Sequence, residues 1–316
     1  MDSRVFSSKM ISNMKEHLES NSTKFITYPK FVFLCGKAII NKTEYERSNR
    51  GLIGKYICNE NNNIYIVLSE KLWEDGFNSD IDLLTFEEFL AEVSDCIVLF
   101  VESPGSFCEL GAFAYADKLF SDKLIVVIDN QYQHSKSFVM TGPVLKVKRN
   151  KSVVVYANLD DGGLLSSFEL RNAILKKTEH FDSKMATINK RVANYDSEKI
   201  NINSFINELL ELLKITQPIG RTDLLCLYKI IKGFSTFSFV KRDGNKFNTE
   251  IKYDYVLKLL QTVNLIQIRK DVITLPNYKK IQNLMFIHNE KAANIERNRL
   301  ICRKYRYWGI NENDYH

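Results

Sequence analysis

The sequence has no apolar run long enough to cross a membrane. No stretch reaches the ~18 consecutive uncharged apolar residues that a spanning helix requires. The opening residues, MDSRVFSSKMISNMKEH, contain no apolar segment of the kind that forms the core of a signal peptide. From these two absences we expect a cytoplasmic protein that does not associate with membranes.

Paired cysteines and clustered histidines are also missing. The 6 cysteines lie far apart with no Cys-x-x-Cys pair, and the 5 histidines form no spacing such as HExxH. Cys35 and Cys96 lie inside apolar runs, where a small buried thiol is common. We therefore expect reduced thiols, no metal ion and no cofactor.

The composition is that of an ordinary globular protein, with 45% hydrophobic and 26% charged residues. A length of 316 residues indicates two domains at ~100 to 200 residues each. Short apolar runs that are continuous rather than alternating predict strands covered on both faces. These runs span residues 31–35, 64–68, 96–101, 124–128 and 153–156.

Helical patterns separate the apolar runs, at residues 44–58, 85–93 and 106–120. Alternation of strand and helix predicts a doubly wound, parallel α/β sheet. We assign this sheet to a first domain of residues 1–160, with its core at about 28–160. Residues 161–200 are expected to form a helical linker.

Residues 201–316 are predicted to form a second, mainly helical domain. Helices at 222–232 and 252–263 precede a tight hairpin over 265–275, and helix, helix, hairpin is the order of a winged helix. This part holds 19 basic and 11 acidic residues, a net charge of +8, whereas residues 1–200 have a net charge of −2. The basic surplus suits nucleic acid or an acidic partner, and a solvated basic surface is the alternative. The candidate contact residues are Lys279, Lys280, Arg297, Arg299 and Arg303.

The segment from Glu102 to Phe113, ESPGSFCELGAF, follows a predicted strand and opens a predicted helix. In open α/β sheets, ligands bind beyond the carboxyl ends of the strands, so this segment is placed for a site. Pro104-Gly105 predicts a turn in which Gly105 lets a ligand approach the backbone. Free N–H groups at the helix start, near Ser106, could hold a hydroxyl or a phosphate.

Glu109 has two interpretations. Ser106 and Glu109 fit the S-x-x-E capping box, in which the carboxylate only satisfies the helix end. The helix N-terminus would also keep Glu109 ionised, as a carboxylate nucleophile requires for attack on a sugar's anomeric carbon, and the two interpretations can both hold. Cys108 is a second candidate nucleophile, but no histidine is near it in sequence to act as a base, so we favour Glu109.

Several of these runs together resemble the nucleoside deoxyribosyltransferase-like effector proteins of bacterial retrons. The resemblance spans about residues 30–145 and rests on FLCG ending the first strand, on the SDCIVLF strand and above all on ESPGSF followed by ELGAF. In the related transferases a glutamate in an E-x-G-x-A context is the nucleophile, which corresponds to Glu109. The acidic residue that binds the base in those transferases is matched only loosely here, by Asp82. The transferases also usually have an acidic residue together with Gly-Thr ahead of the catalytic glutamate, whereas this chain has Glu102 and then Gly105-Ser106.

The resemblance implies a toxin of an antiviral defence system that cleaves the N-glycosidic bond of NAD, giving nicotinamide and ADP-ribose. Its partners would be the retron reverse transcriptase and multicopy single-stranded DNA, which hold it inactive until phage infection. Assembly into homo-oligomers or filaments is left open.

Within that reading, Cys35 and Gly36 would line the base pocket, and Glu102 or Asp82 would orient hydroxyls or the leaving base. Backbone groups of the helix start would hold the sugar or phosphates; these residues are Ser103, Gly105 and Ser106. Two alternatives remain. One is a deoxyribosyltransferase or hydrolase acting on nucleosides or nucleotides, and the other is a catalytically idle nucleotide sensor with a nucleic-acid-binding winged helix.

Overall fold

The structure is a computed structural model, and the chain folds into two compact units. One unit comprises Pro29–Lys184, and the other joins Met1–Tyr28 to Met185–His316. The residues described are 11–12, 14–15, 18, 29–60, 63–73, 81–116, 123–150, 152–159, 164, 167–179, 199–241, 244–247 and 249–276. No helix in these ranges is both long enough and apolar enough to cross a membrane.

A five-stranded parallel sheet forms the centre of the first unit. Its strands follow the order β2-β1-β3-β4-β5, and every pair of neighbours is parallel. The strands are β1 (Lys30–Cys35), β2 (Ile64–Val67), β3 (Cys96–Val101), β4 (Leu124–Asp129) and β5 (Val153–Ala157). The predicted doubly wound parallel sheet is confirmed, and β1, β3 and β4 are buried almost throughout because helices cover both faces.

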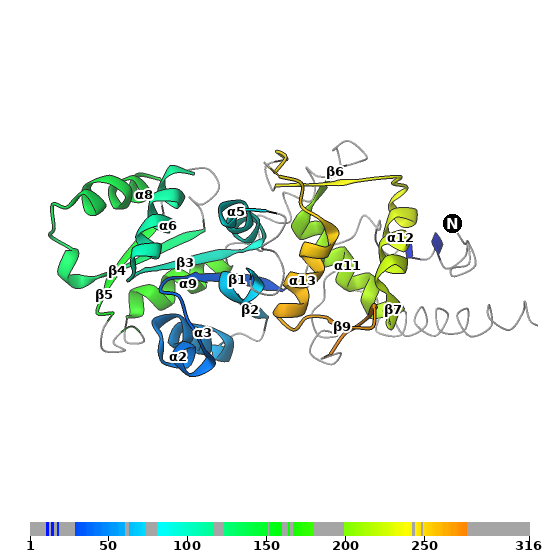
Figure 1. Cartoon of the computed structure of the whole chain (residues 1–316), viewed down its shortest axis with the longest axis horizontal. Coiled ribbons are helices and arrows are strands. Elements are labelled where there is room, and N and C mark those ends of the chain that lie inside the picture. Colours follow the sequence, from blue (N-terminus) through cyan, green and yellow to red (C-terminus); the bar gives the residue numbers. More distant parts are fainter. Residues whose placement is uncertain are drawn as a thin grey trace, which may run out of the picture. The chain divides into compact units, whose positions relative to one another are not determined.

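Helices lie on both faces of this sheet (Figure 1). Within the described residues of this unit, the α-helices are α2 (Lys42–Arg47), α3 (Asn49–Glu60), α4 (Ser69–Leu72), α5 (Leu83–Val93), α6 (Pro104–Tyr115), α8 (Leu145–Arg149) and α9 (Phe168–Glu179). On one face, Ile53 and Ile57 of α3 and Leu170 and Ile174 of α9 join Val98 in one hydrophobic cluster. Helices α5 and α6 cover the opposite face (Figure 1).

Several helix boundaries differ from the sequence prediction, and two of the differences lie near the carboxyl ends of β1 and β3. The single helix expected over residues 44–58 is broken at Ser48, which has extended backbone and ends α2. The Ser48 hydroxyl then accepts a hydrogen bond from the Gly51 N–H in the first turn of α3. Helix α6 begins at Pro104 rather than at Ser106.

Helix α9 lies in the segment that the sequence assigned to a linker. Its Leu170 and Ile174 are buried in the sheet's core, and the Thr178 carbonyl accepts a bond from Lys30 Nζ at 2.6 Å. Residues 168–179 therefore pack as part of the α/β unit, which extends to Lys184. An amphipathic helix packed on a sheet has the same sequence pattern as a helix in a linker, so the pattern could not separate the two.

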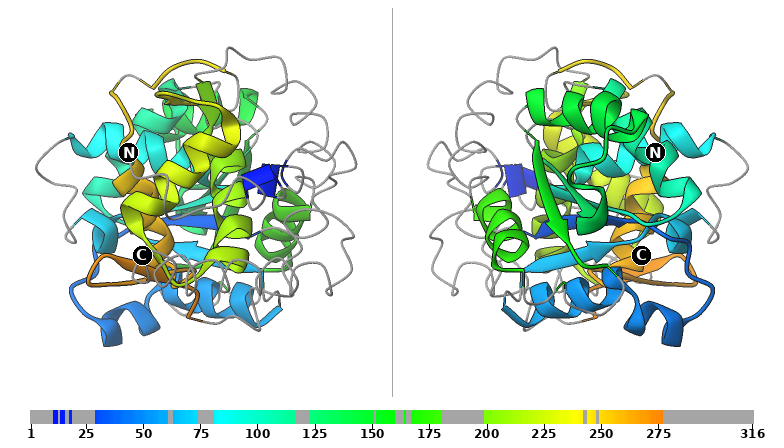
Figure 2. Two further views of the ribbon diagram at one scale, coloured as in Figure 1. Left: turned by 90° about the vertical axis from the view of Figure 1, so that its right-hand side faces the viewer. Right: turned by 90° about the vertical axis from the view of Figure 1, so that its left-hand side faces the viewer.

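Within the described residues, the second unit contains three longer helices and short strands. In chain order these are β6 (Lys199–Asn201), α11 (Ile202–Thr216), β7 (Ile219–Gly220), α12 (Arg221–Lys232), β8 (Ser238–Val240), α13 (Tyr253–Thr262), β9 (Gln267–Arg269) and β10 (Val272–Thr274). Phe205 of α11 packs against the rings of both Tyr228 and Tyr253, which joins the three helices. The ribbons of these helices, coloured from yellow-green to orange, are seen in Figure 2. The predicted hairpin is confirmed: β9 and β10 pair antiparallel, and β10 also pairs with β7.

Candidate functional site

The carboxyl ends of β1 and β3 flank the point at which the sheet changes winding direction. These two strands are neighbours, while the helices that follow them, α3 and α6, lie on opposite faces of the sheet. Such a switch point leaves a crevice between the two connections, and ligands bind there in open α/β folds. Gly36 and Glu102 directly follow these two strands.

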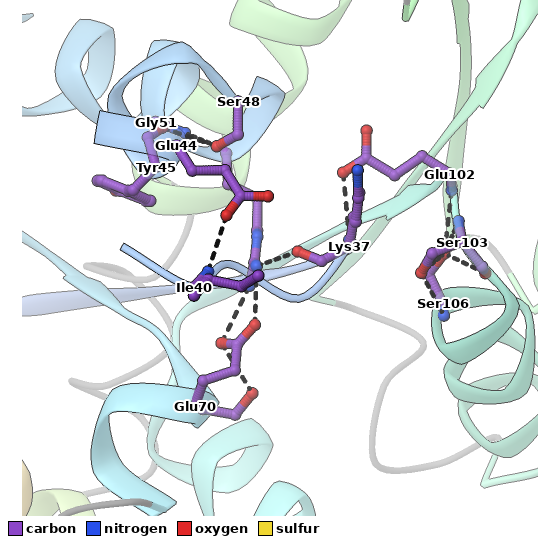
Figure 3. Close-up of polar contacts among 12 residues, drawn as sticks. Lys37, Ile40, Glu44, Tyr45, Ser48, Gly51, Glu70, Glu102, Ser103 and Ser106 are labelled. Atoms are coloured by element: carbon purple, nitrogen blue, oxygen red, sulfur yellow. Dashed lines mark hydrogen bonds and ion pairs between the residues drawn. The ribbon is translucent and has the colours of Figure 1, made fainter. Parts of the chain in front are cut away.

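The Glu102 carboxylate spans the two strand ends (Figure 3). The Lys37 N–H donates to its Oε1 at 3.2 Å, and Asn49 Nδ2 donates to its Oε2 at 2.8 Å. Asn49 Nδ2 also donates a hydrogen bond to the Leu159 carbonyl at 3.0 Å, which holds the amide in place. A Cβ on Gly36 would lie 3.0 Å from Glu102 Oε1, so glycine leaves room for this carboxylate.

Helix α6 is capped by two serines (Figure 3). Ser103 is the N-cap, and its Oγ accepts from the Ser106 N–H, while Ser106 Oγ accepts from the Ser103 N–H at 2.9 Å. Pro104 occupies the first turn, where its missing N–H is not needed. The cap is therefore Ser103 with Ser106, and the interpretation of Glu109 as the partner in a Ser106 capping box is wrong.

Gly105 does not form the turn that the sequence suggested. It lies in the exposed first turn of α6, its φ is not positive, and an added Cβ would approach only Ser103 Oγ, at 3.9 Å. Proline and glycine typically mark turns, but here the serine cap makes Pro104-Gly105 the start of the helix.

Glu109 reaches a buried environment from the second turn of α6. Its Oε2 is buried and has no hydrogen-bond partner in the described part of the chain. Burial and, to a lesser extent, the nearby Glu70 raise the pKa of Glu109 from 4.5 to about 7, while Arg50 opposes the shift. Burial thus acts against the expected effect of the helix N-terminus, which would favour the ionised form of Glu109.

Two further acidic groups, Glu87 and the Cys35 thiol, interact electrostatically with Glu109. We refer to these groups, together with Arg50 and Glu70, as the buried cluster. Glu87 of α5 is buried, and burial followed by the charges of Glu109 and Glu70 raises its pKa from 4.5 to about 8. The Cys35 thiol at the end of β1 is also buried, and burial followed by the charge of Glu109 raises its pKa well above 9.0. The structure thus brings the predicted residues Cys35 and Glu109 together with the unpredicted Glu87.

Arg50 is the cation of this cluster, although its side chain is only 1% exposed. Its Nη2 lies 2.7 Å from Glu70 Oε1, its Nη1 donates to Glu70 Oε2 at 3.0 Å, and Nη2 also donates to the Lys37 carbonyl. Arg50 Nε is buried without a partner among the described residues. Figure 3 labels Glu70 and Lys37, the two residues that this guanidinium contacts.

Sequence reasoning missed Arg50, Glu70 and Glu87. A signal existed for two of them, because Arg50 shares a helix face with the apolar Ile53 and Ile57, and Glu87 shares one with Leu90. A charged residue on the buried face of an amphipathic helix is unusual and indicates a paired or functional group.

Several predicted residues lie elsewhere. Asp82 is exposed and caps α5, where its carboxylate accepts from the Thr85 N–H and Oγ1, bonds that lower its pKa. Cys108 is exposed on α6, and the five cysteines in the described part of the chain form no disulfide. The candidates for nucleic-acid contact lie outside the described residues; they are Lys279, Lys280, Arg297, Arg299 and Arg303.

The arrangement suits covalent or acid–base chemistry. A buried carboxyl group with a pKa near neutrality and a free oxygen can act as a nucleophile or exchange a proton at cellular pH. Within the described ranges, no group of three or more histidine, cysteine, aspartate or glutamate residues is arranged to hold a metal ion.

Comparisons with known proteins agree on one family. The family model described as STM3845 retron effector protein matches residues 46–268. The chain is 35% identical over 127 residues to the "Retron Ec86 putative ribosyltransferase/DNA-binding protein" of Escherichia coli, covering 39% of each chain. It is 38% identical over 120 residues to the corresponding Retron Ec73 protein of the same organism, covering 36% of this chain and 37% of the relative. The chain thus matches about two fifths of the length of these curated relatives.

Proposed function

Because the chain belongs to the STM3845 retron effector protein family, we propose that its α/β unit is a toxin that cleaves the N-glycosidic bond of NAD, giving nicotinamide and ADP-ribose. The observation that carries this proposal is Glu109, a carboxyl group with a buried, unpartnered oxygen and a pKa raised to about 7. It lies on the helix that follows β3, beside the switch point of the sheet. Two curated relatives whose names include "ribosyltransferase" support glycosyl transfer as the reaction class.

The reaction starts from the ionised form of Glu109. One carboxylate oxygen attacks C1′ of the nicotinamide ribose, and the bond from C1′ to the pyridinium nitrogen breaks. Nicotinamide keeps the bonding electron pair and leaves as a neutral molecule, so it needs no proton. Water then attacks C1′ of the glycosyl ester, frees the Glu109 carboxylate and gives up one proton to yield ADP-ribose.

The surrounding residues would hold the substrate. Glu102, fixed by the Lys37 N–H and Asn49, can accept hydrogen bonds from sugar hydroxyls. Cys35 and Gly36 would line the base pocket, and Glu87, which remains mostly protonated at pH 7, can donate a hydrogen bond. Ser103 and Ser106 act by fixing the start of α6, which positions Glu109.

Incubation of the purified full chain with NAD tests the proposal, with chromatography of nicotinamide and ADP-ribose. Glu109→Gln should abolish both products while its thermal midpoint and circular dichroism stay close to those of the wild type. Full activity in Glu109→Gln would exclude the mechanism. Release of free bases from 2′-deoxynucleosides, without NAD cleavage, would favour the deoxyribosyltransferase or hydrolase alternative.

For the second unit we propose nucleic-acid binding as part of a retron complex. Its helices and its β7-β10-β9 sheet follow the order of a winged helix, and residues 201–316 have a net charge of +8. The names of both curated relatives include "DNA-binding". The proposed ligand is the retron's structured single-stranded DNA, bound together with its reverse transcriptase, and this complex would hold the toxin inactive.

A further inference from the structure

Two buried polar atoms of the candidate site have no partner among the described residues, and they are of opposite kind. Arg50 Nε carries an N–H and can only donate, whereas Glu109 Oε2 in the ionised carboxylate can only accept. Buried polar groups in folded proteins are almost always hydrogen-bonded, so an unpartnered one needs an explanation. Here two such atoms occur in a single cluster.

The two atoms act on one another electrostatically but do not bond. The positive charge of Arg50 lowers the pKa of Glu109, and both side chains interact with Glu70, Arg50 through an ion pair at 2.7 Å and Glu109 through charge repulsion. Both atoms nevertheless lack any hydrogen-bond partner within the described ranges, so they are not bonded to each other. A hydroxyl group between them would satisfy both, since it donates one hydrogen bond and accepts others.

Arg50 is also held in place. Both of its terminal nitrogens are engaged, by the Glu70 carboxylate and the Lys37 carbonyl, and its side chain is 1% exposed. The direction of the Nε–H bond is therefore fixed before a ligand arrives. A fixed donor of this kind favours a ligand group at one position, because little side-chain freedom is lost on binding.

We propose that Arg50 and Glu109 together bind the 2′-hydroxyl of the ribose whose C1′ is attacked, and so select ribosyl over 2′-deoxyribosyl substrates. The hydroxyl donates to Glu109 Oε2 and accepts from Arg50 Nε, while the other Glu109 oxygen faces C1′. The inference rests on the proposed function, because it takes Glu109 as the nucleophile. It also assigns to Arg50, which the sequence did not single out, a direct contact with substrate.

The chemistry at C1′ explains the choice of the 2′-hydroxyl. When one oxygen of a carboxylate attacks the anomeric carbon, its second oxygen lies on the side of the neighbouring C2′. Hydrogen bonds to the 2-hydroxyl strengthen in the transition states of glycoside cleavage. A site with buried groups prepared for a hydroxyl also rejects an analogue that lacks it, because those groups then stay unpaired.

Replacing Arg50 by lysine separates the charge from the hydrogen bond. Arg50→Lys keeps a cation for Glu70 but removes the Nε–H donor. The measurement is kcat/KM for NAD and for its analogue with a 2′-deoxy nicotinamide ribose. We expect the wild type to favour NAD by roughly 5- to 150-fold, the range for one unpaired buried polar group, and Arg50→Lys to bring the ratio close to one. Lys42→Gln, which removes an exposed ion pair with Glu46 on α2, is the matched control and should keep the wild-type ratio.

Two results would overturn the inference. One is a wild-type ratio close to one, which decides the question even if Arg50→Lys does not fold. The other is an equal loss for both substrates in a folded Arg50→Lys, since a purely structural role would lower both alike.

A different result would show that the proposed function itself is wrong, namely no cleavage of either compound by the wild type. If the wild type cleaves neither compound, calorimetry with ADP-ribose and 2′-deoxy-ADP-ribose tests the inference as binding alone. Tighter binding of ADP-ribose that Arg50→Lys abolishes would support the inference, and equal binding of both compounds would refute it.

Discussion

Burial makes Glu87 and Glu109 weaker acids than an exposed glutamate. Burial denies each ionised carboxylate the hydration that it would have in water, and the negative charge of Glu70 also disfavours ionisation. Arg50 opposes the shift at Glu109, but Arg50 also forms an ion pair with Glu70. Two carboxyl groups with pKa values near 7 and 8 therefore lie in one cluster, a feature more common at functional sites than in structural ion pairs.

The pH dependence of catalysis follows from the pKa of Glu109. A nucleophile must be ionised, so kcat/KM for NAD should rise with pH with a midpoint near 7. Glu70→Gln removes a negative charge beside Glu109 and should move this midpoint to lower pH. Initial rates measured between pH 5 and 9 test both statements, with Glu46→Gln on the exposed face of α2 as a control. An unchanged midpoint in Glu70→Gln would contradict this account.

The raised pKa of Glu87 predicts a stability effect with a definite sign. A group with a folded pKa of about 8 against a usual 4.5 is most stabilising below pH 4.5, and that stability is lost as pH rises through 8. Glutamine does not ionise, so Glu87→Gln should not lose stability as the pH rises. Its free energy of unfolding should therefore exceed that of the wild type by about 2 to 4 kcal/mol at pH 8.5. At pH 4.5 the two proteins should be nearly equal. Urea unfolding at both pH values measures the difference, and a gap independent of pH would count against a buried, neutral Glu87.

At the scale of elements, the ends of β1 and β3 are closely fitted to each other. Gly36 leaves β1 just beside the Glu102 side chain, which receives hydrogen bonds from Lys37 and Asn49. The Ser106 hydroxyl accepts from the N–H of both Glu102 and Ser103, which joins the end of β3 to the start of α6. The position of Glu109 thus depends on how a strand end, a serine cap and a helix meet.

A methyl group at Gly36 should disturb this junction. The Cβ of Gly36→Ala would lie 3.0 Å from Glu102 Oε1 and 3.3 Å from Phe100 Cβ, and the buried strand cannot yield, so the carboxylate must move. We expect kcat/KM for NAD to fall on the order of 10- to 100-fold, as small displacements of substrate-positioning groups do. Gly36→Ala with full activity would show that Glu102 does not position substrate.

Gly111→Ala provides the stability comparison for Gly36→Ala. Gly111 lies inside α6, and an added Cβ meets nothing within 4 Å. Alanine there should raise the free energy of unfolding by about 0.5 to 1 kcal/mol, since glycine is a poor helix former. Thermal melts of both variants separate a general glycine effect from the specific contact at Gly36.

At the scale of the whole molecule, charge is divided unevenly between the two parts of the chain. Residues 1–200 are slightly acidic, whereas residues 201–316 have a net charge of +8. The acidic cluster around Glu109 belongs to the α/β unit. This division agrees with the proposal that one unit performs the chemistry and the other binds nucleic acid.

The salt dependence of DNA binding tests the second unit. Each phosphate of a single strand that is neutralised contributes a slope of roughly −0.7 in log affinity against log salt. Replacing Lys279, Lys280, Arg297, Arg299 and Arg303 by glutamine in the full chain should flatten the slope by up to about 3.5, while NAD cleavage continues. Filter binding of single-stranded DNA across a salt series measures the slope. No retention of DNA by the wild type even at low salt would refute nucleic-acid binding and leave these charges as a solvated or protein-facing surface.

The sequence by itself determined the elements that depend on local pattern. Continuous apolar runs identified all five strands of the sheet, since a strand buried on both faces must be apolar at every position. The hairpin of β9 and β10 followed from a short polar turn between two apolar runs. Glu109 was selected because it lies just after the third strand of a doubly wound sheet, where such folds bind ligands.

Only the tertiary structure decided the electrostatics of the site. Arg50, Glu70 and Glu87 lie on three different helices, and the strand order 2-1-3 brings them to Glu109. The sequence placed Glu109 at a helix N-terminus and predicted an ionised carboxylate, whereas the Ser103 cap moves the helix start and burial raises the pKa. A pKa depends on the loss of water and on charges distant in sequence, and these are properties of the folded chain that no local pattern contains.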